Sequence, residues 1–296
     1  KGVVPLLSGI FGAAKLIIKK RPTVIVGFGG YPSFPGMIAG QILGVPTILH
    51  EQNAIWGKAN KALAQAAIKI ALSWPKTKGM SEAQQGKSVI TGNPVRAEIM
   101  GLVGKTRGSA NKNDTLRIFI MGGSLGATVF SEVIPKGLAH LPKEKLQNIE
   151  IVQQCREGDI QAAQSAYDQI GMNVILAPFI NDVAGELSKA DLFIGRSGAS
   201  TVAEIAVAGV PAIFVPYPHH KDQQQKHNAD ALSNCGAAWT VEERDFTPEA
   251  LAQRIQAFLD DPSILTQAAC QSGLSSGGDA AKNLADLVID IAKKQG

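Results

Sequence analysis

The chain has 296 residues, of which 45% are hydrophobic and 18% are charged, and its formal net charge is +4. This composition is that of a core-forming globular protein and excludes a disordered chain, and the length is sufficient for two domains of ordinary size. The mild positive charge, without a basic stripe containing aromatic residues, argues against a nucleic-acid partner. The three cysteines, Cys155, Cys235 and Cys270, have no C-x-x-C spacing, so neither a disulfide framework nor a zinc site is predicted.

The segment 3–21 predicts a helix with apolar side chains and a basic end. It is either an ordinary core helix whose lysines favour the helix dipole, or a surface that docks on an anionic membrane. No apolar run in the chain reaches the roughly 18 residues that a membrane-spanning helix needs. On the docking interpretation, the membrane-contacting residues are Leu6, Leu7, Ile10, Phe11, Lys15, Lys19 and Lys20.

The residues that follow predict an α/β domain. A strand is expected at Thr23 to Phe28, a tight turn at Gly29 to Tyr31, a helix at Ser33 to Leu43 and a strand at Pro46 to His50. The polar run His50 to Asn53 (HEQN) stands at the strand end where ligands of open α/β sheets bind. Because such side chains are costly to bury unpaired, we expect them to line a cleft; a capped loop without a ligand is the alternative.

A second domain is predicted after a linker. Ser88 to Thr91 is expected to be the last strand of the first half, and residues 101–114, rich in Gly, Lys and Asn, are the best linker candidate. The strand Leu116 to Met121 then leads into the Gly-rich turn 122–127, which is of the kind that binds phosphate before a helix. Further strands and helices of the chain are expected at Glu150–Gln154, Asp159–Ile170, Asn173–Leu176, Ala238–Val241, Pro248–Asp260 and Asp279–Lys294.

The stretch from Asp191 to Asn228 is where we expect the chemistry. A strand at Leu192 to Ile194, a Gly/Ser turn and a helix from about Ser200 to Ala208, ended by Gly209, place backbone N–H groups where a phosphate can bind. Glu204 in that helix can accept hydrogen bonds from the hydroxyls of a ribose.

A second strand at Val210 to Pro216 leads to a helix for which Asp222 is the expected N-cap. Asp222, Gln224, Gln225 and Asn228 offer polar groups suited to sugar hydroxyls. A plain turn and a solvated helix face are the alternative interpretation, but the order of these features in one β-α-β unit favours a nucleotide-sugar site.

Several catalytic arrangements are missing from the sequence. It contains no P-loop lysine, no nucleophile elbow, no His/Cys metal cluster and no Asp-x-Asp pair that would hold a metal against a diphosphate. The remaining means of stabilising a diphosphate leaving group are helix N-termini at Ser124 and residues 197–201, together with Arg96 and Arg196. We therefore predict a metal-independent site without a cofactor.

GRSGASTVAEIAVAGVPAIFVPYP, followed by KDQQQKHNA, resembles the donor-binding region of the MurG-type glycosyltransferases, and the resemblance extends over the whole chain. The resemblance implies an inverting transfer of GlcNAc from UDP-GlcNAc to undecaprenyl-pyrophosphoryl-MurNAc-pentapeptide, which converts lipid I to lipid II in peptidoglycan synthesis. It also implies two Rossmann-like domains facing a cleft (the GT-B fold), and a cytoplasmic enzyme peripheral on the inner face of the bacterial plasma membrane.

Matching the family motifs residue by residue assigns the site. GGY followed by HEQN is similar to the acceptor-side motif and gives Tyr31, Asn53 and Asn60, with His50 and Glu51 as candidate catalytic residues. Leu125, Thr128 and Ser131 stand where the family commonly has Gln, Arg and Asn. The donor-binding residues implied are Arg96, Gly123, Ser124, Gly126, Ile180, Arg196, Ser197, Gly198, Ala199, Ser200, Thr201, Glu204, Gln224, Gln225 and Asn228.

The family's N-terminal loop of pattern GGTGGH has no match here, so we expect roughly two strand–helix units to be missing and the N-terminal domain to be incomplete. The expected division is an acceptor and membrane-side domain at 1–96, a linker at 97–115 and a donor domain at 116–278, with the helix 279–296 packing back on the first domain. Two alternatives stay open: a donor-binding subunit of a split glycosyltransferase, and a UDP-sugar epimerase or hydrolase of the same fold.

Overall fold

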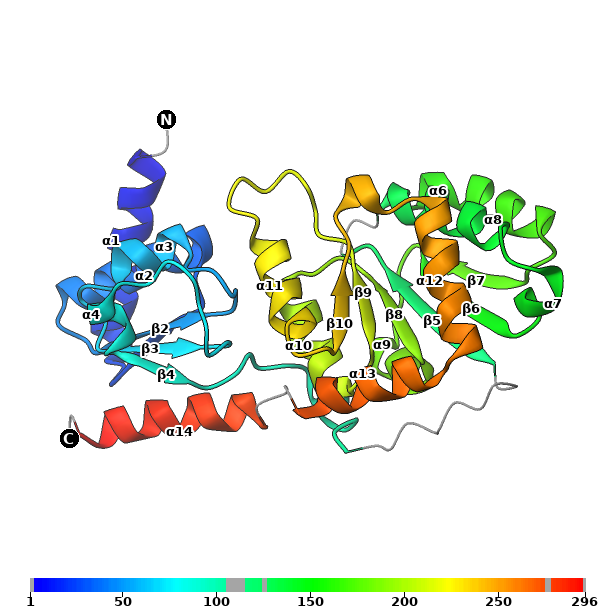
Figure 1. The fold of residues 1–296 in the computed structure, drawn as a ribbon. Coiled ribbons are helices and arrows are strands. Elements are labelled where there is room, and N and C mark those ends of the chain that lie inside the picture. Colours follow the sequence, from blue (N-terminus) through cyan, green and yellow to red (C-terminus); the bar gives the residue numbers. More distant parts are fainter. Residues whose placement is uncertain (1–2, 105–114, 124–126, 275–277, 295–296) are drawn as a thin grey trace. The chain divides into compact units, whose positions relative to one another are not determined.

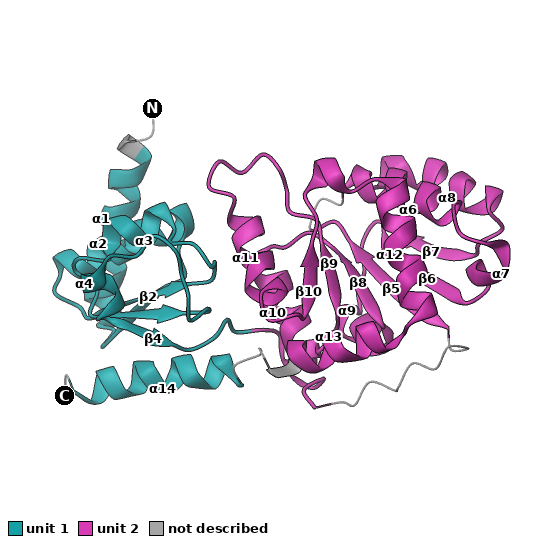
Figure 2. Ribbon diagram, viewed as in Figure 1, with its two compact units in different colours: residues 1–94, 277–296 teal, residues 95–276 magenta. Residues whose placement is uncertain are grey.

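The computed structural model describes residues 3–104, 115–123, 127–274 and 278–294 (Figure 1). The chain forms two compact units: unit 1 consists of residues 1–94 and 277–296, and unit 2 consists of residues 95–276 (Figure 2). Both units are built on parallel sheets, which confirms the predicted α/β class.

Unit 1 contains a four-stranded parallel sheet in the order β1-β2-β3-β4. Its strands are β1 (Ile25–Gly27), β2 (Thr47–Glu51), β3 (Lys69–Leu72) and β4 (Ser88–Ile90). Its helices are α1 (Val3–Lys20), α2 (Gly30–Ile42), α3 (Lys58–Leu63), α4 (Glu82–Gln85) and α14 (Ala280–Lys293).

Both faces of the unit 1 sheet are covered by helices. Successive residues of a strand point to opposite faces, and accordingly Leu49 packs with Met37 of α2 while its neighbour Ile48 packs with Leu284 and Ile291 of α14. Figure 1 shows α14 along the face of this sheet opposite to α2 and α3. A strand covered on both faces is rich in apolar residues, which explains the adjacent Ile48 and Leu49 before His50.

Unit 2 contains a six-stranded parallel sheet in the order β10-β9-β8-β5-β6-β7. Its strands are β5 (Leu116–Met121), β6 (Ile149–Gln154), β7 (Val174–Ala177), β8 (Leu192–Gly195), β9 (Ala212–Phe214) and β10 (Ala238–Thr240). Its helices are α5 (Ala97–Met100), α6 (Thr128–Leu138), α7 (Lys143–Leu146), α8 (Ile160–Gln169), α9 (Val183–Lys189), α10 (Ala199–Ala208), α11 (Gln224–Ser233), α12 (Pro248–Asp260) and α13 (Ser263–Leu274), with 3-10 helices η1 (Glu157–Asp159) and η2 (Glu243–Asp245).

The strand order of unit 2 reverses between β5 and β8. From β5 the chain continues through β6 and β7 on one side, and it then returns to the other side through β8, β9 and β10. In open α/β sheets, ligands bind at the carboxyl ends of the strands beside such a reversal. The Gly-rich turn after β5 and the turn after β8 both stand at this point.

Two predictions about helix ends have opposite outcomes. Gly209 ends α10 in the left-handed conformation (φ 66), as predicted. Asp222 is not the N-cap of α11, because Gln223 adopts a left-handed conformation (φ 50) and takes that position without a side-chain cap. Asp222 instead accepts a hydrogen bond from Nε2 of Gln224 at 2.8 Å.

Candidate functional site

The turn after β8 leads directly into the N-terminus of α10. A Cβ at Gly195 would lie 2.4 Å from the carbonyl oxygen of Met121, so only glycine fits where this strand passes β5. Gly198 is the N-cap of α10 and supplies no side-chain hydrogen bond. A helix N-terminus whose N-cap residue contributes no side chain leaves room for an anionic group such as phosphate.

Glu204, in the second turn of α10, is paired with Arg96, the N-cap residue of α5. Nε of Arg96 donates to Oε1 of Glu204 at 2.9 Å, and Nη2 donates to Oε2 at 3.0 Å. These bonds raise the pKa of Arg96. Each carboxylate oxygen keeps a second lone pair, so a hydroxyl of a ligand can still donate to Glu204.

The start of α10 is bonded to α11. Oγ of Ser197 donates to the backbone oxygen of Gln225 at 2.8 Å, and Nδ2 of Asn228 donates to the backbone oxygen of Ser197 at 3.3 Å. The side-chain oxygen of Gln225 accepts from the N–H of Tyr217 at 2.9 Å. The structure thus brings these predicted residues together, and their bonds hold the amide-rich end of α11 beside the turn after β8.

Arg196 is bonded on several sides by groups of unit 2. Its Nη1 donates to the carbonyl oxygens of Val215 at 2.9 Å and Pro216 at 3.1 Å, and its Nη2 forms an ion pair with Glu243. Only 11% of the side chain is exposed. The guanidinium is therefore held by the ends of β9 and β10, and its action on a leaving group stays a prediction.

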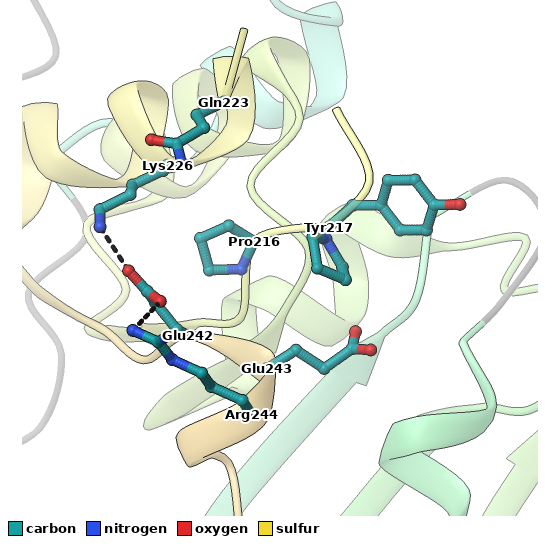
Figure 3. A pocket seen from close by; sticks show the side chains of 8 residues that line it. Pro216, Tyr217, Gln223, Lys226, Glu242, Glu243 and Arg244 are labelled. Carbon is teal, nitrogen blue, oxygen red and sulfur yellow. Dashed lines mark hydrogen bonds and ion pairs between the residues drawn. The ribbon is translucent and has the colours of Figure 1, made fainter. Parts of the chain in front are cut away.

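A pocket of about 240 Å³ lies at the carboxyl ends of β9 and β10, and Glu243, the partner of Arg196, is one of its lining residues (Figure 3). Figure 3 shows Glu242 between Lys226 and Arg244 and bonded to both, the latter at 2.8 Å. This arrangement lowers the pKa of Glu242, first through the hydrogen bond from Lys226. The charges along this wall of the pocket therefore compensate one another.

The Gly-rich turn after β5 is described only in part. Gly123 adopts φ +86, a conformation that favours glycine, whereas Ser124 and Gly126 lie outside the described residues. The following helix, α6, has no side-chain cap at Ala127, and the hydroxyl of Thr128 donates to Oδ2 of Asp159 at 2.8 Å.

Ile180 lies in the loop between β7 and α9 and is partly exposed. Asp182 closes this loop by accepting the N–H of Gly185 at 2.7 Å, which caps α9. This predicted donor-binding residue is thus held next to a helix start at the carboxyl end of β7.

In unit 1, the carboxylate of Glu51 is 1% exposed and accepts four hydrogen bonds. Oε1 accepts from the backbone and side-chain nitrogens of Asn53, both at 3.1 Å, and Oε2 accepts from Gly57 N and Asn60 Nδ2, both at 2.9 Å. All its lone pairs are used. Glu51 therefore fixes the loop that follows β2, and no lone pair remains for the predicted catalytic role in this arrangement.

The side chain of His50 is also buried and hydrogen-bonded within unit 1. Its side chain is fully buried, and Nε2 lies 2.9 Å from the carbonyl oxygen of Gly92, so Nε2 carries the proton. Nδ1 is buried without a hydrogen-bond partner, and burial lowers the pKa of the imidazole. The basic nitrogen of His50 has no exposed surface, so the structure does not support the predicted role as catalytic base.

The other two residues predicted for the acceptor side differ in position. Asn60 is 2% exposed, and its amide lies against the Gly29-Gly30 turn, where a Cβ on Gly29 would be 3.3 Å from Nδ2. Tyr31 is 90% exposed in the first turn of α2. Asn53 and Asn60 therefore belong to one hydrogen-bonded cluster with Glu51, and Tyr31 stands outside it.

Comparison with known proteins identifies the family of this chain. Residues 1–72 match the N-terminal domain, and residues 117–286 the C-terminal domain, of glycosyltransferase family 28. The chain is 43% identical over 284 residues to the UDP-N-acetylglucosamine–N-acetylmuramyl-(pentapeptide) pyrophosphoryl-undecaprenol N-acetylglucosamine transferase of Rhodospirillum centenum, which covers 96% of this chain and 75% of that relative. The crystal structure of Acinetobacter baumannii MurG has a TM-score of 0.80 and 32% identity, covering 98% of this chain and 81% of that one.

The chain belongs to the MurG family of glycosyltransferases. A second relative with the same name, from Methylorubrum extorquens, is 42% identical over 291 residues, 98% of this chain and 79% of that relative. MurG-family membership makes the chain a glycosyltransferase with the GT-B fold. A UDP-GlcNAc 2-epimerase from Neisseria meningitidis (TM-score 0.71, 13% identity, 96% of this chain and 81% of that one) shares the fold alone.

The first helix of this MurG-family chain carries exposed apolar side chains. Leu7 is 59% and Phe11 is 64% exposed, and the ammonium of Lys15 lies 4.6 Å from the centre of the Phe11 ring. Leu6 and Ile10 are half-buried, while Lys19 and Lys20 are exposed. No described helix has both the length and the apolar character needed to cross a membrane.

Three residues at the unit 2 site were missed by the reasoning from sequence. Glu243 pairs with Arg196, Tyr217 bonds Gln225, and Nε2 of Gln154 donates to the carbonyl oxygen of Pro178 at 3.3 Å. A polar side chain at the end of an apolar strand was the available signal for Gln154. Tyr217 lies within the motif that resembles the family but was not singled out there, and Glu243 lies in a segment without a comparable pattern.

Proposed function

We propose that this chain transfers N-acetylglucosamine from UDP-GlcNAc to undecaprenyl-pyrophosphoryl-N-acetylmuramyl-(pentapeptide), the reaction after which its relatives are named. The observation that carries the proposal is the position of Glu204 in the second turn of α10, a helix that starts from Gly198 at the strand reversal of unit 2. A helix N-terminus suits the diphosphate and a carboxylate suits the ribose, so this element alone accommodates two of the parts common to every UDP-sugar.

The donor half of the mechanism follows from these groups. Negative charge develops on the diphosphate as UDP leaves, and the first turn of α10 stabilises that charge without a proton transfer. Glu204 accepts from the ribose hydroxyls while Arg96 holds the carboxylate in place. Gln224 and Gln225, at the start of α11, offer amide groups to the sugar.

The transfer itself is proposed as a single in-line displacement with inversion. An acceptor hydroxyl attacks the anomeric carbon, the bond from that carbon to the diphosphate oxygen breaks, and the hydroxyl proton passes to a general base. We do not assign His50 or Glu51 as this base, because the first donates its only proton to Gly92 and the second has four internal donors. Their proposed role is to hold Asn53 and Asn60 on the acceptor side.

We also propose that the protein is peripheral on the cytoplasmic face of the plasma membrane, where a lipid-linked acceptor is found. The exposed face of α1 supports this proposal, because Leu7, Phe11 and Ile18 share one side of the helix and are each more than half exposed. Apolar side chains next to lysines are typical of helices that bind anionic bilayers.

The direct test is a transfer assay with the full-length gene product, radiolabelled UDP-GlcNAc and a lipid-linked MurNAc-pentapeptide acceptor. We expect label in the lipid fraction and stoichiometric release of UDP. Release of UDP or appearance of an epimerised sugar nucleotide at the same rate without the acceptor would overturn the proposal and favour a hydrolase or epimerase.

The same assay tests whether the leaving group is stabilised without a metal. Because helix N-termini supply the compensating charge in the proposal, activity is expected to persist in excess chelator. Complete loss in chelator, restored by a stoichiometric divalent ion, would show that the diphosphate is neutralised by a bound metal.

A further inference from the structure

The loop 178–182 presents unused backbone groups at the carboxyl end of β7, the edge of the sheet where the proposed nucleotide site also stands. Within the described part of the chain, neither the N–H nor the C=O of Ile180 has a hydrogen bond. Ile180 is only partly buried, so both groups have a route to a ligand. Unpaired backbone groups next to a ligand site are ready to be satisfied by that ligand.

A donor and an acceptor on one residue match the edge of uracil. The C=O of Ile180 can accept from the N3–H of uracil, and its N–H can donate to the neighbouring carbonyl oxygen. Cytosine presents an acceptor at N3 and a donor at N4, so the same pair faces groups of the wrong kind. A site built to hydrogen-bond a substrate discriminates strongly only when its groups are held in place.

Gln154 holds the loop 178–182 in place at its first residue. It is the last residue of β6, is 4% exposed and stands opposite Ala177 of β7. Its Nε2 donates to the carbonyl oxygen of Pro178 at 3.3 Å, immediately before Phe179 and Ile180. The loop is thus tied at its start by Gln154 and at its end by the Asp182 cap.

The side-chain oxygen of Gln154 is evidence that the bond from this amide to Pro178 has a function. Oε1 of Gln154 is buried without a hydrogen-bond partner, which is unfavourable for the folded state. An apolar side chain of the same shape would remove this unpaired group. If this position served packing alone, an apolar residue would be more favourable than glutamine.

We propose that Gln154 is a positioning residue for base selection: its amide holds Pro178 and thereby sets the backbone of Ile180 against uracil. This inference rests on the proposed UDP-sugar function. It assigns the discrimination between uridine and cytidine nucleotides to a side chain that does not itself touch the base.

The test compares the dissociation constants of UDP and CDP by calorimetry in the full-length protein. The wild type is expected to prefer UDP. Gln154→Met, which keeps the volume and removes both amide groups, should leave the melting temperature unchanged or raise it while reducing the preference for UDP about five- to tenfold. Gln154→Leu is a second apolar variant and is expected to behave in the same way.

Gln153→Met is the matched control, because Gln153 is buried next to Gln154 but bonds to Ser131 at 3.2 Å and Tyr167 at 2.6 Å. It should lower the melting temperature and keep the UDP preference. Variants of Gln154 that melt like the wild type and keep its preference would overturn the positioning role. A wild type that binds UDP and CDP equally, or binds neither, would instead overturn the proposed donor.

Discussion

The carboxylate of Glu204 illustrates how one side chain can serve the fold and a ligand together. Arg96 occupies one lone pair on each oxygen, and the side chain of Glu204 is only 16% exposed, so the carboxylate is oriented before any ligand arrives. A preoriented acceptor loses little conformational entropy on binding. The ribose hydroxyls therefore meet an acceptor that is already in place.

Replacing Glu204 by Ala should weaken UDP binding by about 1–3 kcal/mol, because the ribose hydroxyls lose their acceptor in a partly buried site. Titration calorimetry measures this loss. Glu150→Ala is the control, since Glu150 also pairs with an arginine, Arg117, at 3.0 Å but stands at the start of β6. Equal UDP affinity of the Glu204 variant and the control variant would remove Glu204 from the donor site.

His50 gives unit 1 a dependence on pH. Burial lowers its pKa below the ordinary value of 6.5, so the folded state prefers the neutral ring and the unfolded state binds the proton more readily. The stability is therefore fully present above pH 6.5 and decreases as the pH falls below it, by at most about 1.4 kcal/mol per pH unit.

Urea unfolding between pH 7.5 and pH 5 measures this dependence as the difference between the wild type and His50→Gln. The difference should shrink on acidification, because the variant has no imidazole to protonate. His140→Gln, at a position where the side chain is 52% exposed, is the control and should follow the wild type. Parallel curves for His50→Gln and the wild type would contradict the assignment.

At the scale of elements, the bounds of helices and strands were predicted best where neighbouring residues in the sequence mark them. Leu116–Met121 and Pro248–Asp260 have the predicted bounds; the second has Thr247 as its N-cap, accepting from Ala250, and a proline in its first turn. β3, with four residues, and α13 were not predicted. A strand of that length is too short to show a period, and the apolar residues of α13 do not form one stripe.

The site residues were harder to assign because their partners are distant in sequence. Arg196 was predicted from its motif, but its role is set by Glu243, 47 residues away. The roles of His50 and Glu51 are likewise set by Gly92 and Asn60. A motif indicates which residues gather at a strand end, whereas their hydrogen bonds depend on the tertiary structure.

The exposed face of α1 leads to a prediction for the whole helix. Binding to vesicles of anionic lipid should weaken with added salt, and the combined change of Lys15, Lys19 and Lys20 to Gln should weaken it further, by about 1 kcal/mol for each charge. Co-sedimentation with vesicles measures both effects.

The matched control changes three exposed lysines elsewhere, Lys76, Lys143 and Lys189, to Gln. These changes should have a smaller effect on vesicle binding, and neither triple variant should alter UDP binding. If the protein binds neutral and anionic vesicles equally, or binds neither, α1 has no role at an anionic membrane.

At the scale of the whole molecule, unit 1 depends on both ends of the described chain. Leu284 and Ile291 of α14 complete the core that contains Ile48 and Ala71. Leu284→Ala should therefore reduce the unfolding free energy of unit 1 by about 2–5 kcal/mol, and UDP binding by unit 2 should not change.

Tryptophan fluorescence can isolate this effect. Trp56 and Trp74 belong to unit 1, so in a Trp239→Phe background the signal reports unit 1 alone. Ile289→Ala, on the same helix but 48% exposed, is the control and should cost far less. A Leu284 variant as stable as this control would show that α14 contributes little to unit 1.

The discontinuity of unit 1 has a consequence during synthesis on the ribosome. Strands β1 to β4 emerge first, but the helix that covers Ile48 and Ala71 emerges only after residues 95–276 have been translated. At about 5–20 residues per second, this delay is on the order of ten seconds or more. Unit 2 is continuous in sequence and can finish folding within that time, so the first unit to begin folding is the last to be completed. During the delay, one apolar face of the β1–β4 sheet stays uncovered. We expect chaperones to bind this nascent intermediate, because exposed apolar surface promotes aggregation.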